Sequence, residues 1–188
     1  TFPTTTNAFD RKLTGVAPLD AFVARFSTTG GLEYSTFLGG NGREYGYAIA
    51  VRGNGEFVVT GRSHAAPDTS WSASVAYNQM SNGFPITTNS AQTTQNGYGD
   101  VFVTRFNNAG KITYSTFLGG SEYDTGYAIA FGNAGNIFVA GETESPNLNT
   151  VAAIQSNLPG TDGFVARLNP ASAGAADVTY LTYFGGGT

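Results

Sequence analysis

The chain has no cysteine and only one histidine, one tryptophan and one methionine among its 188 residues. No disulfide framework and no thiol nucleophile can therefore exist, and one histidine without cysteine does not make a zinc site. Charged residues are only 12% of the chain, and the formal net charge is −4. A nucleic-acid partner needs a dense Lys/Arg surface, so we expect none.

Long apolar runs are also missing, because no stretch approaches the roughly 18 residues that span a bilayer, so we expect no membrane insertion. No initiator Met and no signal peptide are visible, and we expect a processed chain or a piece of a longer one. The lack of cysteine fits a cytosolic protein or a bacterial surface protein. The low charge and the 26 glycines favour an extracellular or bacterial cell-surface location.

The strongest positive signal is an internal repeat. Residues 20–61 and 100–141 align at an offset of 80 without a gap, and 21 of these 42 positions are identical. Three motifs recur: YSTFLGG (34–40 and 114–120), GYAIA (46–50 and 126–130), and FPTTTN, which returns as FPITTN (2–7 and 84–89). A diverged third copy supplies DGFVARL (162–168) and YLTYFGG (180–186).

Each copy predicts four short antiparallel strands, at 20–26, 32–38, 47–51 and 57–61 in the first copy. One four-stranded sheet cannot bury both of its faces, so the copies must stack, as propeller blades do. Small residues suit the crowded axis, which makes GYAIA the innermost strand and YSTFL the outermost. The sequence predicts an all-β fold: a partial β-propeller of about two and a half blades.

We expect one propeller segment over residues 1–188, divided as follows: a preamble and the outer half of a preceding blade (1–46), a blade with a long inserted loop at 62–99 (47–118), and a second blade (127–184). Two and a half blades do not close a circle, and unpaired strand edges invite association. The expected partners are therefore the remainder of a longer chain or neighbouring copies of the same chain.

The motifs FPTT, DAFVARF, YSTFLGG and GYAIAV resemble the SBBP repeat, a β-propeller repeat common in large bacterial secreted and cell-surface proteins. The resemblance extends over nearly the whole chain. It implies the propeller fold and an extracellular setting, and it brings no catalytic residues. The chain departs from the repeat between Gly61 and Phe84 and in the longer hairpin at 169–179.

Repeat-equivalent charged residues are the first candidates for a site: Asp20, Asp100 and Asp162, and Arg25, Arg105 and Arg167. They could form a ring of ligand contacts. A residue present in every blade is usually needed by the blade, so we favour a structural interpretation. In it, each Asp caps a turn and each Arg spans a blade junction.

Two turn acids, Glu44 and Asp124, occupy matching positions and are weak candidates for Ca²⁺ ligands. Their spacing matches no calcium loop, so ordinary turn hydrogen bonding is the favoured interpretation. We expect no cofactor. Catalysis has little support, because His64 is the only histidine, no GxSxG motif occurs, and no carboxylate pair is set apart from the repeats.

The non-repeated segment 62–83 holds the unusual residues His64, Trp71 and Tyr77, which are candidate ligand-binding residues on a loop. Trp71 could instead pin this loop to the blade. The leading hypothesis is a non-catalytic structural or adhesive module that binds a glycan polymer or a surface protein through its loops. Its alternatives are a self-assembling subunit of an extracellular filament or oligomer and a segment of a polysaccharide-active enzyme.

Overall fold

The computed structural model describes residues 2–13, 19–64, 83–156 and 160–186. Its strands are β1 (Ala21–Phe26), β2 (Leu32–Leu38), β3 (Arg43–Val51), β4 (Phe57–His64), β5 (Asp100–Phe106), β6 (Ile112–Leu118), β7 (Asp124–Phe131), β8 (Ile137–Thr143), β9 (Asp162–Leu168) and β10 (Val178–Phe184). Two short 3-10 turns, at Asn133–Gly135 and Gly174–Asp177, complete the elements. No helix in these ranges is long and apolar enough to cross a membrane.

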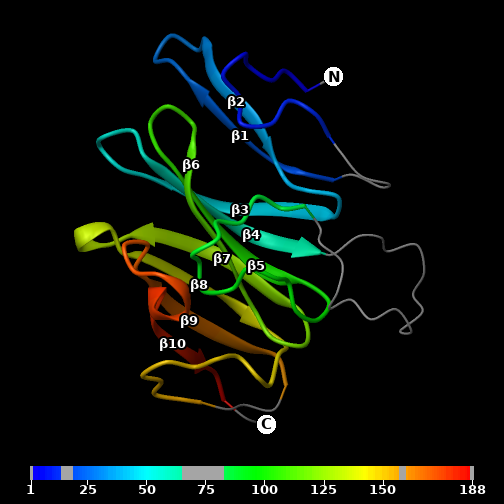
Figure 1. Cartoon of the computed structure of the whole chain (residues 1–188), viewed down its shortest axis with the longest axis vertical. Coiled ribbons are helices and arrows are strands. Elements are labelled where there is room, and N and C mark those ends of the chain that lie inside the picture. The colour runs from blue at the N-terminus through cyan, green and yellow to red at the C-terminus, as the bar shows by residue number, and fades with distance from the viewer. Residues whose placement is uncertain (1, 14–18, 65–82, 157–159, 187–188) are drawn as a thin grey trace.

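The strands form three antiparallel sheets, ordered β1-β2, β3-β4-β5-β6 and β7-β8-β9-β10. The two four-stranded sheets are complete blades, and β1-β2 is the outer half of a third; we call it the half-blade. In each complete blade the glycine- and alanine-rich strand comes first and the aromatic strand last, which is the predicted order. The fold is all-β and propeller-like, with the half-blade at one end of the stack and the second blade at the other (Figure 1).

The inner strands are longer than predicted. β3 begins at Arg43 rather than at 47, and β7 begins at Asp124 rather than at 127. β4 continues through His64, so the connection to β5 begins after 64 and not at 62. The reason is that the ladder between β3 and β4 resumes beyond an irregularity next to Gly46 and runs on to the pair of Arg43 with His64. Because this irregularity interrupts the regular register of the strand, the sequence pattern does not predict the added residues.

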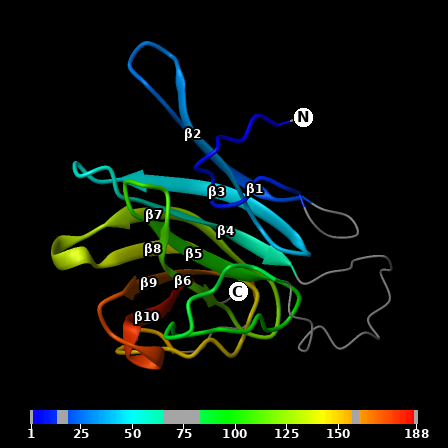
Figure 2. The ribbon, with the colours of Figure 1, turned by 45° about the horizontal axis from the view of Figure 1, so that its top comes forward.

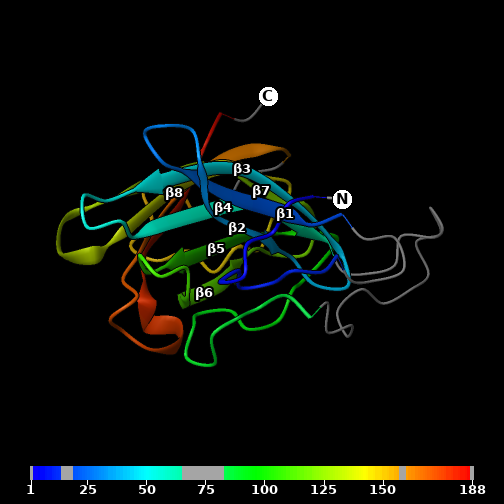
Figure 3. The same cartoon turned by 90° about the horizontal axis from the view of Figure 1, so that it is seen from above.

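Adjacent sheets bury their apolar faces against each other. In β4, Phe57 and Val59 belong to the cluster shared with the half-blade, whereas Val58 belongs to the cluster shared with the second blade. This alternation follows from the two-residue period of a strand, and a strand buried on both faces must be apolar throughout. Seen from above, the half-blade lies over the strands of the first blade (Figures 2 and 3).

The preamble, which is the motif FPTTTN at 2–7 and its repeat FPITTN at 84–89, covers the outer edges of β2 and β6. The amide of Thr5 donates to the carbonyl of Ser35 in β2 (3.1 Å), and the amide of Thr87 donates to that of Ser115 in β6 (3.0 Å). The aromatic contacts are also equivalent: Phe2 lies against Phe22 and Phe37, and Phe84 against Phe102 and Phe117. The preamble therefore protects an edge that would otherwise remain open.

Candidate functional site

Aromatic side chains gather where the inner strands of the two blades meet. We call this group the tyrosine site: Tyr45, Tyr47, Arg62, His64, Tyr98, Tyr123 and Tyr127. The rings of Tyr45 and Tyr47 stack with centroids 6.4 Å apart and an interplanar angle of 7°. Tyr47 also contacts Tyr127 of the next blade, at 5.4 Å between centroids. The result is a run of rings that crosses a blade junction.

A β-bulge in each inner strand positions the two junction tyrosines. In β3, Gly46 pairs with Gly61 and Ala48 pairs with Thr60, which leaves Tyr47 as the extra residue. The equivalent irregularity in β7 leaves Tyr127 as the extra residue between Gly126 and Ala128. A bulge bends its strand and redirects a side chain, and such features gather beside functional sites. Tyr47 and Tyr127 are 44% and 51% exposed, so their rings are available to a ligand.

Arg62 and His64 connect the tyrosines of the two blades. The Arg62 guanidinium lies 5.6 Å from the ring centroid of Tyr45 and 5.5 Å from that of Tyr123, within cation–π range. The His64 ring lies 5.7 Å from Tyr45 and 5.6 Å from Tyr123. Tyr98 extends the run, with its centroid 5.4 Å from that of Tyr123. These contacts join the five tyrosine rings into one continuous group.

Only one member of this site, His64, was predicted from the sequence. His64 was a predicted ligand-binding residue and lies within the site, whereas Trp71 and Tyr77 lie outside the described residues. Tyr47 and Tyr127 were not predicted because the GYAIA motif indicates an innermost strand through its small residues, and Tyr45, Tyr98 and Tyr123 lie outside that motif. The available signal was the repetition of Tyr47 at Tyr127, a bulky residue inside an otherwise small-residue motif.

The repeat-equivalent aspartates contact the first glycine of each Gly-Gly pair. A Cβ at Gly39 would lie 2.5 Å from the Asp20 carboxyl, and a Cβ at Gly119 would lie 2.6 Å from that of Asp100. The third copy repeats the arrangement with Asp162 beside Gly185. Asp100 also accepts hydrogen bonds from the Asn96 amide (2.9 Å) and from the Gln92 side chain. These contacts join the start of one strand to the turn after another.

The turn acids are buried beside these aspartates. Glu44 accepts hydrogen bonds from the Gly40 amide (2.9 Å) and the Ser63 hydroxyl (2.8 Å). Asp124 accepts from the Gly120 amide (2.8 Å) and the Ser145 hydroxyl (2.9 Å). Among the residues that the structure describes, no group of three or more His, Asp or Glu side chains is placed to hold a metal ion.

Burial raises the pKa values of these acids. Burial, with a small contribution from the charge of Asp20, raises the pKa of Glu44 to about 7. Burial and the nearby Asp10 raise the pKa of Asp20 to about 6. At the second junction, burial and then the charge of Asp124 raise the pKa of Asp100 well above its usual range. Each junction therefore holds a pair of carboxyl groups that resist ionisation.

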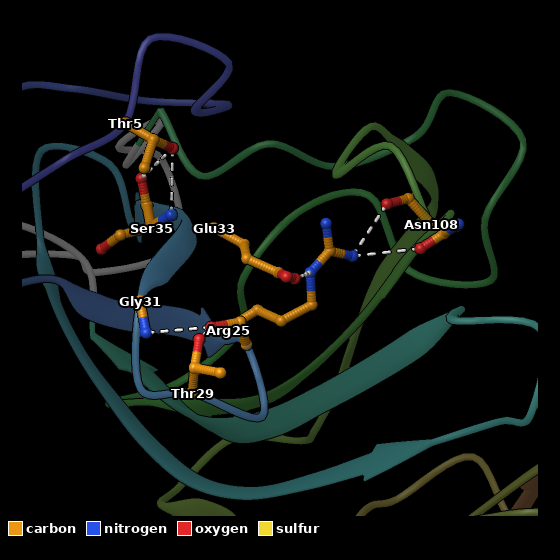
Figure 4. A network of polar contacts seen from close by, with 8 residues as sticks. Thr5, Arg25, Thr29, Gly31, Glu33, Ser35 and Asn108 are labelled. Atoms are coloured by element: carbon orange, nitrogen blue, oxygen red, sulfur yellow. Dashed lines mark hydrogen bonds and ion pairs between the residues drawn. The ribbon is translucent and has the colours of Figure 1, made fainter.

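The repeat-equivalent arginines do not share one role, contrary to the expectation that each spans a junction. Arg25 does so, because its Nη1 donates to the backbone and side-chain oxygens of Asn108 in the next blade, at 3.0 Å each (Figure 4). Arg105 binds Glu56 of its own blade through two hydrogen bonds (2.9 and 3.0 Å). Arg167 donates to Thr179 of its own hairpin (2.7 Å). The partners differ because the hairpins that supply them have diverged.

The family model SBBP, described as a beta-propeller repeat, matches residues 113–149. No curated protein matches the chain. The resemblance over nearly the whole chain that the motifs suggested is thus supported only for this stretch. The matched stretch begins in β6 and contains β7 and β8, so the sequence unit begins in the outer strand of one blade and extends past the two inner strands of the next.

Proposed function

We propose that this chain is a non-catalytic propeller module of an extracellular or bacterial cell-surface protein, and that it binds a glycan polymer through the tyrosine site. The observation that carries the proposal is the pair of bulge tyrosines, Tyr47 and Tyr127, whose half-exposed rings lie 5.4 Å apart across a blade junction. Exposed, rigidly held aromatic rings give large contact area at little entropy cost.

Several features favour a polymer over a small ligand. The rings form an extended run over two blades and the residue Tyr98 that precedes β5. Successive rings offer apolar faces to successive sugar rings, while Arg62 and the tyrosine hydroxyls offer hydrogen bonds to sugar hydroxyls. The low charge and the 26 glycines support the extracellular setting, as does the repeat match.

Binding to an array of immobilised glycans tests this proposal. Tyr47→Ala together with Tyr127→Ala should weaken binding to any glycan that the parent retains by at least about tenfold, because each ring is a contact residue. Phe184→Ala is the matched control, since Phe184 is 65% exposed but lies outside the tyrosine site. Equal binding by the double variant and the control would reject the site. Release of shortened glycan products would contradict the non-catalytic assignment.

The loop residues predicted from sequence are tested separately. Trp71→Ala with Tyr77→Ala should also weaken binding if the loop after His64 contributes to the same surface, and the melting temperature should not fall. If the affinity of this variant for the glycan is unchanged, the glycan contacts the tyrosine site and not Trp71 or Tyr77.

Self-assembly is the second candidate function, and the exposed apolar side chains at both ends of the stack favour it. These include Phe22 and Phe26 on the half-blade and Phe184 on the second blade. Exposed apolar patches often mark association surfaces. A stable monomer in light scattering at micromolar concentration would dismiss this candidate.

A further inference from the structure

Arg62 lies in the tyrosine site without an acidic partner. Elsewhere in the described part of the chain, the side chains of Arg25, Arg52 and Arg105 each form an ion pair with a glutamate, at 3.3, 3.5 and 2.9 Å. Arg62 forms no ion pair within the same residues. Its positive charge is therefore not neutralised by the fold.

The hydrogen-bond donors of Arg62 are also largely unused. Its Nη1 lies 3.5 Å from the hydroxyl oxygen of Thr125, at the outer limit of a hydrogen bond. Its Nε is buried and has no hydrogen-bond partner. The guanidinium lies over the rings of Tyr45 and Tyr123, and these rings attract its charge. A ring face does not replace the oxygen acceptors that five N–H groups require, so donors remain for another group.

The buried acids of the same blade junction do not serve as counter-ions for Arg62. The carboxyl of Asp100 accepts hydrogen bonds from the Asn96 amide and the Gln92 side chain, and that of Asp124 accepts from other neighbours. Burial raises the pKa of both acids, which disfavours their charged forms. A counter-ion for Arg62 has to come from elsewhere.

The blade itself does not require an arginine at this position. At the offset of 80 residues, Arg62 of β4 corresponds to Glu142 of β8. The ladders agree, because Arg62 pairs with Val101 of β5 and Glu142 pairs with Gly163 of β9. The second blade thus forms with an acid in place of the base. Since a structural residue would be needed in both blades, this difference favours a binding role for Arg62.

We infer, on the basis of the glycan binding proposed above, that Arg62 is a carboxylate subsite and that the bound glycan contains a uronic acid. The guanidinium donates two parallel N–H groups to the two oxygens of one sugar carboxylate, a geometry that a planar fork provides. The rings of Tyr45 and Tyr123, which already lie against Arg62, contact the apolar faces of the same sugar or its neighbour.

Charge limits how acidic this glycan is. The net charge of the chain is −4, so long-range repulsion opposes a densely charged polyanion. The tyrosine site offers one arginine among five tyrosine rings. We therefore expect uronic acids spaced among neutral sugars, with one carboxylate at the subsite and neutral sugars on the remaining rings.

A glycan array in which every glycan with a uronic acid is paired with its methyl ester tests the inference on the full chain. The parent should bind an acidic glycan at least about tenfold more tightly than its ester, because the ester lacks the charge-assisted pair of hydrogen bonds. Added NaCl should weaken binding to the acid and leave binding to the ester unchanged.

Substitutions of Arg62 separate its charge from its shape. Arg62→Gln should abolish the preference for the acid and keep the affinity for the ester. Arg62→Lys keeps the charge without the planar fork, and it should lower the preference by at least about threefold, which also provides a readout if Arg62→Gln does not fold. Arg52→Gln is the matched control, because Arg52 also lies over a ring, 4.9 Å from the centroid of Phe131, but is paired with Glu56.

Two outcomes would overturn the inference and leave the proposed glycan binding intact. The first is a parent chain that retains neutral glycans alone, or binds acid and ester equally. The second is a preference for the acid that both Arg62 variants retain, or an equal loss of acid and ester in Arg62→Gln, which would make Arg62 a support for the tyrosine rings. A parent that retains no glycan at all would reject the proposed function itself.

Discussion

The hydroxyl of Tyr114 donates a 2.9 Å hydrogen bond to the carboxylate of Asp177, which lies 63 residues further along the chain and in the next blade. The equivalent Tyr34 of the half-blade donates to the carbonyl of Gly110 at 3.0 Å. In both cases a tyrosine from an outer strand contacts the outer hairpin of the next sheet. The outer rim of the stack is therefore held by specific polar contacts as well as by apolar packing.

Removal of one such hydroxyl should lower the stability of the stacked sheets. Tyr114→Phe leaves a buried carboxylate with one fewer donor, and we expect a loss of about 1–3 kcal/mol in the free energy of unfolding. Urea denaturation measures this loss. Tyr180→Phe is the control, because Tyr180 is the equivalent residue in the third copy and is only half-buried. Equal effects of the two substitutions would contradict the role assigned to Tyr114.

The junction acids should make stability depend on pH. Glu44 has a pKa of about 7 in the folded chain, against an ordinary value of 4.5. Between these values the folded chain binds more protons than the unfolded chain, so the free energy of unfolding falls as pH rises from 4.5 to 7. The loss attributable to Glu44 is at most about 3.5 kcal/mol, at roughly 1.4 kcal/mol per pKa unit.

The variant Glu44→Gln isolates this contribution, since the amide oxygen can still accept from Gly40. Its free energy of unfolding should equal that of the parent near pH 4.5. Near pH 8 it should be higher than that of the parent. Glu33→Gln is the control, because the Glu33 side chain is 48% exposed. Parallel pH profiles for the parent and Glu44→Gln would show that Glu44 ionises normally in the folded state.

Close backbone approach should make Gly141 intolerant of a side chain. A Cβ there would lie 1.9 Å from the carbonyl oxygen of Thr125 and 2.9 Å from the ring of Phe164. We expect Gly141→Ala to cost about 1–3 kcal/mol or more, which is the usual range for overpacking. Gly53→Ala should change stability little, since a Cβ at Gly53 has nothing within 4 Å. Thermal melts of the two variants make the comparison.

Arg25 should stabilise the half-blade locally rather than the whole chain. Arg25→Ala removes the contacts with Asn108, and we expect faster hydrogen exchange in β1 and β2 with less than about 1 kcal/mol of change in global stability. Arg167→Ala is the matched control, because Arg167 donates to Thr179 of its own hairpin. Equal exchange in β1 and β2 for the two variants would mean that Arg25 does not hold the half-blade in place.

The repeat made the blades and their strand order predictable, because gapless identity fixes equivalent strands and residue size identifies the crowded axis. The repetition of Tyr47 at Tyr127 was visible in the sequence, but the bulge that exposes these side chains was not predictable, because a bulge adds one residue to a strand without a distinct motif. The divergent roles of Arg25 and Arg105 were not predictable either. Each arginine is placed by the repeat, but its partner is supplied by hairpin residues that vary between copies.

Stacking of successive repeats is the claim on which both proposed sites depend, and a pair of introduced cysteines tests it most directly. A Cβ at Gly126 would lie 3.4 Å from the Cβ of Thr60, close to the separation of about 3.5–4.5 Å in a disulfide. Because the chain has no cysteine, Thr60→Cys with Gly126→Cys should oxidise completely to one internal disulfide, detected by thiol titration and intact mass. Val59→Cys with Gly126→Cys should stay reduced, since Val59 faces the half-blade. Free thiols in the first variant and a disulfide in the second would contradict the stacking.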